Sequence, residues 1–264
     1  MRETDTKQIR TERLNRRVAE TVACGVKPIE LLFEPIYDLG DAEIVAYRAD
    51  PCIHSLQIGT LLPADFFGAT VPETLLFDFA MRALRKAVSA SHMIAERPER
   101  VKLLTVRVPT TLIYKEENLT AELIAACVGA SEATPLCLEF YEDAMDADGG
   151  TLERAIREIH AAGLCVAVDG YGGEGFPVEK LLSVCPDILF TSPRVAALAT
   201  DRGRASALAP LLNFAKSLGA QIIADAVEGD DALREFRSRD AFGFLPAKNY
   251  AGKFAFAKAP FPEG

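Results

Sequence analysis

Three short segments of the chain are apolar at almost every position, and they constrain its fold more than any other feature. They read LCVAVD at 164–169, DILF at 187–190 and QIIADAV at 221–227. Strands that are apolar on both faces belong to parallel sheets covered on both sides. Segments with helical patterns lie between them, which favours a layered α/β fold.

The same alternation runs through most of the chain. Strands are predicted at 29–39, 43–49, 101–108, 135–142, 164–172, 186–193, 220–228 and 241–250. Helices are predicted at 72–95, 120–130, 149–163, 178–185, 205–219 and 229–239. Repeated strand–helix alternation without a long linker predicts a TIM-like (β/α)8 barrel, with an open doubly wound sheet as the alternative.

The polar N-terminus is predicted to be a separate element. Residues 1–26 form a helical extension in this interpretation, because apolar residues recur there near helical spacing. Residues 27–264 then form the barrel domain. A chain of 264 residues is long enough for one domain of this size.

Charge and hydropathy exclude some partners. A net charge of −9 argues against a nucleic-acid partner, because binding phosphates requires clustered Lys and Arg. The chain has no apolar run long enough for a membrane span and no apolar leader at its charged N-terminus, so we expect no membrane and a cytoplasmic location. The 6 cysteines include no CxxC pair, and we expect reduced thiols rather than a zinc site.

Polar and charged residues stand at the ends of the predicted strands, where barrels carry their chemistry. They are Arg48, Arg107, Glu139, Glu142, Asp169, Ser192, Asp225 and Glu228. The acids among them are oxygen ligands of the kind that Mg²⁺ and Mn²⁺ prefer. Strand-end acids can equally cap helices or face water, and spacing alone leaves both interpretations open.

Eight segments, in this order, resemble those of the EAL domain, the cyclic-di-GMP phosphodiesterase module of bacterial signalling. They are LLFEPIYDLGDAEIVAYRA, LLPADFF, LTVRVP, CLEFYED, VAVDGYG, PDILFTS, IIADAVE and FGFL. The resemblance covers residues from about 30 to 260, nearly the whole chain. It implies an EAL-type barrel and a mechanism in which strand-end acids and an Asn bind one or two Mg²⁺ or Mn²⁺ ions that activate water.

The resemblance also shows which functional positions are replaced. Arg48 stands where the family has the Glu of its Glu-Ala-Leu signature, and Arg107 where it has a ligand Asn. Gly170 replaces the second of two aspartates, and Phe190 replaces the catalytic Lys. Phe242 takes the place of a Gln before the final Gly.

Other positions of the resemblance keep their acids. Glu139, Asp169 and Glu228 match the family, while Asp225 is a shortened Glu. With arginines among them, we expect Glu139, Asp169 and Asp225 to be remnant acids that hold no metal, because a guanidinium stays positively charged. Arg48 and Arg107 are expected to pair with Glu139 and Asp169 instead.

The resemblance and these replacements leave three functions open. The first is a catalytically inactive EAL-like domain that acts in signalling by binding another protein. The second is a cyclic-di-GMP receptor that binds without hydrolysis, with Arg48, Arg107, Phe190 and Phe242 as ligand-binding candidates. The third is an active phosphodiesterase with rearranged ligands. The family also makes a homodimer plausible.

Overall fold

The computed structural model describes most of the barrel domain. The described residues are 29–55, 59–62, 73–97, 101–109, 119–127, 134–141, 149–201, 203–248 and 250–251. The predicted helical extension at 1–26 lies outside them, as do Glu142 and residues 63–67 of the LLPADFF segment.

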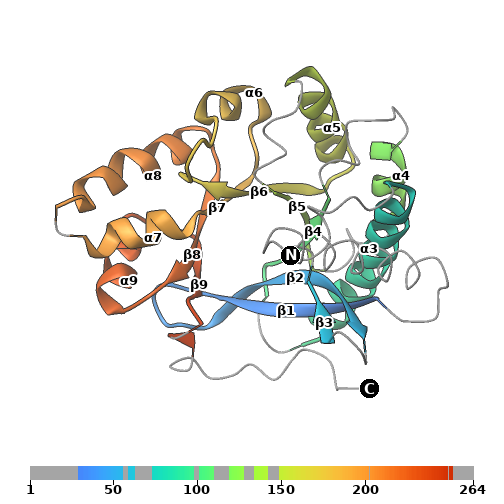
Figure 1. Cartoon of the computed structure of the whole chain (residues 1–264), viewed down its shortest axis with the longest axis horizontal. Helices are drawn as coiled ribbons and strands as arrows, with labels where there is room; N and C mark the ends of the chain where they lie inside the picture. The colour runs from blue at the N-terminus through green and yellow to red at the C-terminus, as the bar shows by residue number, and fades with distance from the viewer. Residues whose placement is uncertain are drawn as a thin grey trace, which may run out of the picture.

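Eight strands close into a barrel (Figure 1). These eight are β1 (Ile29–Tyr37), β2 (Ile44–Ser55), β4 (Leu103–Val108), β5 (Leu136–Phe140), β6 (Cys165–Tyr171), β7 (Ile188–Thr191), β8 (Gln221–Val227) and β9 (Gly243–Pro246), and the described sheet has one further strand, β3 (Gly59–Leu61), outside the ring. Their order is β1-β9-β8-β7-β6-β5-β4-β2, and β1 pairs with β2 to close the ring. The closed ring confirms the predicted barrel and excludes the open sheet.

One barrel strand runs against the others. From β2 through β9 the barrel strands are parallel, whereas β1 is antiparallel to both β2 and β9. The tight connection at 38–43 explains this, since a short hairpin can join only antiparallel strands. The short strand β3 pairs with the end of β2 as an additional strand beside the barrel.

Helices surround the barrel on its outside (Figure 1). The α-helices are α3 (Glu73–Ala95), α4 (Leu119–Ala126), α5 (Gly149–Ala161), α6 (Leu181–Val184), α7 (Pro193–Thr200), α8 (Leu208–Ser217) and α9 (Asp230–Arg237). Two 3₁₀ turns, η4 (Val178–Lys180) and η5 (Ala205–Ala207), precede α6 and α8. Helix α7 was not predicted; Pro193 at its first turn is a favourable position for proline.

The barrel interior has its own apolar core. The buried residues that form it all come from strands: Ile36, Val45, Ala46, Leu103, Cys137, Ala167, Ile188, Phe190, Ile223 and Leu245. A second, larger core packs the outward strand faces against the helices. Burial on both faces is what the near-continuous apolar runs predicted.

Strands β6 and β8 carry matching irregularities near their carboxyl ends. The pairing register shifts between Val168 and Tyr171 in β6 and between Ala224 and Val227 in β8. Gly170 has φ 82° and Ala226 has φ 55°, so both bulges place a residue in the left-handed region. Each of these residues directly follows an aspartate.

Candidate functional site

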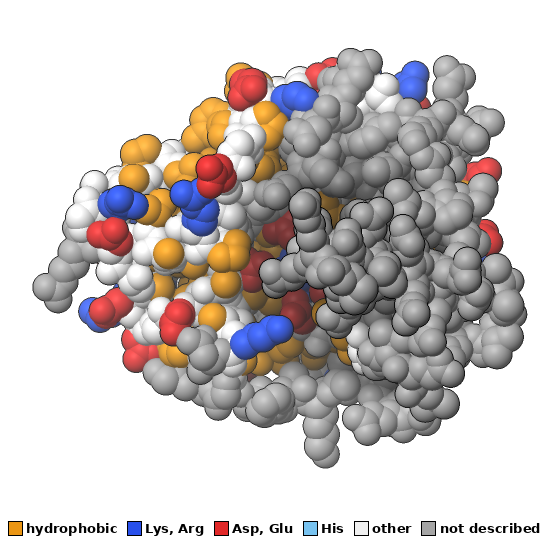
Figure 2. Space-filling view, in the orientation of Figure 1, with side chains coloured by type: hydrophobic (Ala, Val, Ile, Leu, Met, Phe, Trp, Pro, Cys, Tyr) orange, Lys and Arg blue, Asp and Glu red, His pale blue; other side chains and the backbone are white. Residues whose placement is uncertain are grey.

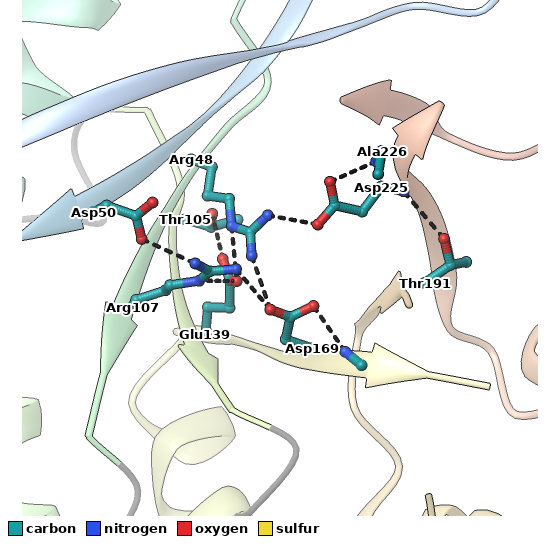
Figure 3. Close-up of polar contacts among 10 residues, drawn as sticks. Arg48, Asp50, Thr105, Arg107, Glu139, Asp169, Thr191, Asp225 and Ala226 are labelled. Atoms are coloured by element: carbon teal, nitrogen blue, oxygen red, sulfur yellow. Dashed lines mark hydrogen bonds and ion pairs between the residues drawn. The ribbon is translucent and has the colours of Figure 1, made fainter. Parts of the chain in front are cut away.

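Arg48 on β2 lies at the centre of a charged cluster inside the carboxyl end of the barrel (Figure 3). Its Nη1 donates to Asp225 Oδ2 at 3.0 Å, and its Nη2 donates to Asp169 Oδ2 at 2.8 Å. Its Nε lies 3.0 Å from Glu139 Oε1, in an ion pair without hydrogen-bond geometry. The side chain is only 2% exposed. One buried guanidinium therefore contacts carboxyl groups from β5, β6 and β8.

Arg107 on β4 contacts two of the same oxygen atoms. Its Nε donates to Glu139 Oε1 at 2.7 Å, and its Nη2 donates to Asp169 Oδ2 at 2.6 Å. Its Nη1 forms a looser ion pair with Asp50 Oδ1 at 3.3 Å. The ion pairs expected from the sequence between the two arginines and Glu139 and Asp169 are thus present.

The ladder register of the sheet explains why these side chains meet. Arg48 pairs with Thr105 across β2 and β4, and Arg107 pairs with Glu139 across β4 and β5. Residues two apart on a strand point to the same face. Asp50 therefore shares the inner face with Arg48, and Thr105 shares it with Arg107. The Thr105 hydroxyl donates to Glu139 Oε2 at 3.0 Å.

The two bulges aim the aspartates at Arg48. Asp169 Oδ1 accepts a hydrogen bond from the N–H of Gly170 at 2.7 Å, and Asp225 Oδ1 accepts one from Ala226 at 2.6 Å. This arrangement leaves Oδ2 of each aspartate to accept from Arg48. The backbone N–H of Asp225 donates to the hydroxyl of Thr191 on β7 at 3.0 Å, which fixes the second bulge further.

Burial and charge shift the pKa values of the cluster in opposite ways. Burial raises the pKa of Glu139 to about 8, although Arg48 lowers it. Burial also raises the pKa of Asp50 to about 7 and raises that of Asp225. Burial would lower the pKa of Arg48, but the surrounding carboxylates outweigh it and raise that pKa well above its ordinary value. The cluster therefore keeps its cations and holds protons on part of its acids near neutral pH.

Aromatic rings support both guanidiniums. Arg48 Cζ lies 4.8 Å from the centre of the Phe190 ring, and Arg107 Cζ lies 5.2 Å from the Tyr141 ring. Both distances suit cation–π contacts. Phe190 is fully buried. Its ring lies against the guanidinium of Arg48, and its role as a ligand-binding candidate stays a prediction.

Phe242, a further candidate, lies away from the cluster. Phe242 immediately precedes β9, and its ring lies 5.7 Å from Lys102 Nζ, just ahead of β4. Both residues are at the amino ends of parallel strands, opposite to Arg48, so Phe242 does not belong with the other ligand-binding candidates. Glu228 follows β8 and is exposed.

Sequence reasoning missed three members of the cluster. Asp50, Thr105 and Thr191 are not among the candidates that the sequence predicts. Period-two spacing was the available signal for Asp50 and Thr105, which stand two residues from Arg48 and Arg107. No sequence signal indicated Thr191, because its role depends on the bulge in the neighbouring strand.

The residues present do not fit a divalent metal. Such an ion needs several oxygen donors at about 2.0–2.6 Å. Here guanidinium nitrogens approach the acids of the cluster to 2.6–3.0 Å and stand between them. Within the described ranges, no group of three or more His, Cys, Asp or Glu side chains could hold a metal ion.

A barrel of mainly parallel strands with its polar cluster at their carboxyl ends is an α/β barrel of the TIM type. Within that class, the model of the EAL domain matches residues 19–244 of the chain. The chain therefore belongs to the EAL domain family. No curated protein gives a sequence match.

Solved EAL structures share the fold. The EAL enzyme Bd1971, in a form bound to cAMP and cyclic-di-GMP, is 13% identical with a TM-score of 0.75, over 91% of this chain and 65% of that one. The FimX EAL domain of Pseudomonas aeruginosa, bound to c-di-GMP, is 16% identical with a TM-score of 0.72, over 88% and 93% of the two chains. The FimX EAL domain of Xanthomonas citri, in complex with c-diGMP, is 14% identical with a TM-score of 0.72, over 92% and 94%.

Identities this low show a common fold. The chain spans 65% of the length of the Bd1971 chain, about two thirds.

None of the helices in the described parts of the chain combines the length and the hydropathy of a membrane span.

Proposed function

We propose that this chain is an EAL domain of bacterial signalling that does not hydrolyse cyclic-di-GMP and acts by binding another protein. One observation carries the proposal: Arg48 and Arg107 stand between the acids that would have to bind a divalent metal. At about 4 Å two unit charges repel by roughly 4 kcal/mol at an effective dielectric of 20, and a divalent ion doubles that cost.

The exposed charge at the carboxyl end also disfavours an anionic ligand. Arg48 is 2% exposed, whereas the side chains of Asp169 and Asp225 are 19% and 23% exposed. Glu34 on β1 lies opposite Arg48 in the ladder and is exposed as well. Figure 2 shows acidic side chains gathered in the central hollow of this face. A phosphate approaching the hollow meets carboxylates before it meets the buried guanidinium.

The alternative is a cyclic-di-GMP receptor without hydrolysis. Arg107 favours it, because its side chain is 17% exposed, whereas that of Arg48 is 2% exposed. The two FimX EAL domains of the same fold are described as bound to this dinucleotide. An active phosphodiesterase with rearranged ligands is a third function, supported only by the remaining acids.

Two assays on the purified chain separate these functions. Hydrolysis of cyclic-di-GMP is measured with Mg²⁺ and with Mn²⁺, and binding is measured by calorimetric titration with and without Mn²⁺. We expect no hydrolysis and no binding heat. Hydrolysis that is abolished by Glu139→Gln would establish an active enzyme and overturn the proposal.

Metal-independent binding that is lost in Arg107→Ala, but kept in Arg194→Ala, would establish the receptor. Arg194 is a suitable control because it is 65% exposed and its ion pair is with Glu174, which is not an acid of the cluster. If both assays are negative, proximity labelling in the source bacterium followed by reconstitution of the purified pair identifies the partner. Sedimentation analysis tests the proposed homodimer.

A further inference from the structure

Ser192 has a buried hydroxyl group without a hydrogen-bond partner among the described residues. The residue is 6% exposed, and its Oγ atom makes no hydrogen bond there. Ser192 is also the N-cap of α7, where a serine normally accepts a hydrogen bond from the first turn of the helix. Its side chain makes no such bond. Because a buried polar atom without a partner destabilises the fold, this hydroxyl points to a ligand.

The strand register places the hydroxyl in the acidic hollow at the carboxyl end of the barrel. Ser192 continues β7 with an extended backbone, at φ −66° and ψ 155°. It stands two residues beyond Phe190, which belongs to the inner core, so the two side chains face the same way. Strand β7 lies between β6 and β8, which carry Asp169 and Asp225. The hydroxyl therefore lies between two aspartates.

The two aspartates can accept further hydrogen bonds. Their side chains are 19% and 23% exposed, for Asp169 and Asp225 respectively. Asp225 Oδ2 accepts from Arg48, and its Oδ1 accepts from the N–H of Ala226. A carboxylate oxygen has two lone pairs, so each oxygen of Asp225 has one left for another donor. Two carboxylates and one hydroxyl, from three neighbouring strands, thus line the same part of the hollow.

The acids of the hollow outnumber its cations. In the described residues the interacting carboxyl groups are those of Glu34, Asp50, Glu139, Asp169 and Asp225, and the cations beside them are Arg48, Arg107 and Lys248. Burial raises the pKa of Glu139 and Asp225, so protons offset part of this surplus of acid. The first turn of α7 adds only a partial positive charge beside Ser192. The hollow can therefore accept a further cation.

From these observations we propose that the hollow receives the ammonium group of a lysine side chain from the partner protein, held by Ser192 Oγ, Asp169 and Asp225. This inference rests on the proposed function and deepens it, because it names the surface and the chemistry of the partner. An ammonium group has three donors and no acceptor, which suits one hydroxyl and two carboxylates. A guanidinium is a larger planar fork that needs its acceptors in one plane.

The test uses the full chain and the capped peptide acetyl-Gly-Gly-Lys-Gly-Gly-amide as the probe. Binding is followed in amide NMR spectra, where the N–H groups of Gly170 and Ala226 report on the aspartates to which they bond. Both signals are expected to shift to saturation at low salt, with a Kd of about 1–10 mM. The peptide with an acetylated lysine should leave both signals in place, because acetylation removes the charge.

Matched variants isolate the hydroxyl. Ser192→Ala should weaken peptide binding at least about fivefold, yet melt within about 2 °C of the wild type, because its Oγ has no partner to lose among the described residues. Ser217→Ala makes the same change on α8, where the hydroxyl donates to the Phe214 carbonyl, and should bind as the wild type does. Asp225→Asn should weaken binding about tenfold; if it does not fold, Ser192→Ala supplies the test.

Three results would overturn the inference. They are signals of Gly170 and Ala226 that the lysine peptide leaves in place, a Ser192→Ala variant that binds the peptide as tightly as the wild type, and an arginine peptide that binds at least as tightly as the lysine peptide. None of these involves the dinucleotide. Hydrolysis or binding of cyclic-di-GMP would instead overturn the proposed function, so the two failures are distinguishable.

Discussion

Inside the barrel, the ring of Phe190 separates a charged layer of side chains from an apolar layer. Above its ring, toward the carboxyl ends of the strands, Arg48 and Arg107 are surrounded by carboxyl groups. Below it, Ile223 and Cys137 belong to a purely apolar core. Apolar packing is non-directional, and losing one contact costs only that contact. A buried charge cluster is stable only while each charge keeps its partners. The two layers should therefore respond differently to mutation and to pH.

The largest loss of stability is expected from removing the guanidinium of Arg48, the cation at the centre of the cluster. Arg48→Ala leaves Glu139, Asp169 and Asp225 without their shared partner, and breaking a buried ion pair in this way costs about 3–5 kcal/mol. Urea denaturation measures the loss in free energy of unfolding. The exposed Arg194→Ala is the control and should cost less than about 1 kcal/mol, as surface pairs do.

The pH dependence of that loss in stability distinguishes the charged layer from the apolar layer. At low pH Glu139 and Asp225, whose pKa values burial raises, bind protons and no longer need a cation, so Arg48→Ala should cost less near pH 5 than near pH 8. A cost that is the same at both pH values would show that Arg48 acts through packing rather than through charge.

The next largest loss of stability is expected from a substitution in the apolar layer. Ile223 is fully buried in the inner core. Ile223→Ala removes apolar contacts and leaves a cavity, at a cost of about 3 kcal/mol. Because no charge is involved, the cost should be equal at pH 5 and pH 8. Leu182→Ala is the control, since Leu182 is 62% exposed and should change stability little. A strong pH dependence for Ile223→Ala would remove the distinction between the layers.

The wild type itself should lose stability as the pH rises. Glu139 and Asp50 have folded-state pKa values of about 8 and about 7, above their ordinary values of 4.5 and 3.8. The folded state therefore binds protons more tightly than the unfolded chain. Their contribution is fully present below the ordinary pKa values and is lost as the pH rises through the folded ones. Each group lowers the free energy of unfolding by about 1 kcal/mol per pH unit within its window.

Glu139→Gln tests this assignment, because glutamine resembles the protonated acid and does not titrate. The variant should flatten the fall in stability between about pH 5 and pH 8, leaving the part due to Asp50. Thermal unfolding across that range provides the measurement. Glu174→Gln changes an exposed acid and should leave the slope as in the wild type. An unchanged slope in Glu139→Gln would assign the protons to other groups.

The sequence predicted the apolar layer and the charged layer to different extents. Strand positions followed directly from the apolar runs, since burial on both faces leaves few other interpretations. The ion pairs of the arginines were expected from the resemblance, which places Arg48 and Arg107 at ligand positions of the family. For Phe190 and Phe242, the strand period says which face a ring occupies but not at what height in the barrel it lies. That height depends on the register between strands, which the sequence does not reveal.

The smallest predicted effect concerns the backbone that aims the two aspartates. Ala226 in the β8 bulge has φ 55°, a conformation that costs an L-residue about 1 kcal/mol, whereas Gly170 in the β6 bulge has φ 82° without that cost. Ala226→Gly should therefore raise the free energy of unfolding by up to about 1 kcal/mol, and Gly170→Ala should lower it by a similar amount.

Chemical denaturation of the two variants measures both changes, and the hydrogen bonds from each aspartate to the next N–H should persist. Because neither substitution touches a charge, both changes should be the same at pH 5 and pH 8. If instead Gly170→Ala lost stability mainly at high pH, the bulge would act by aiming Asp169 at the arginines. In that case the β6 bulge would affect stability through the charged side chains. The boundary at Phe190 would then divide the backbone of the barrel, as well as its side chains, into a charged and an apolar part.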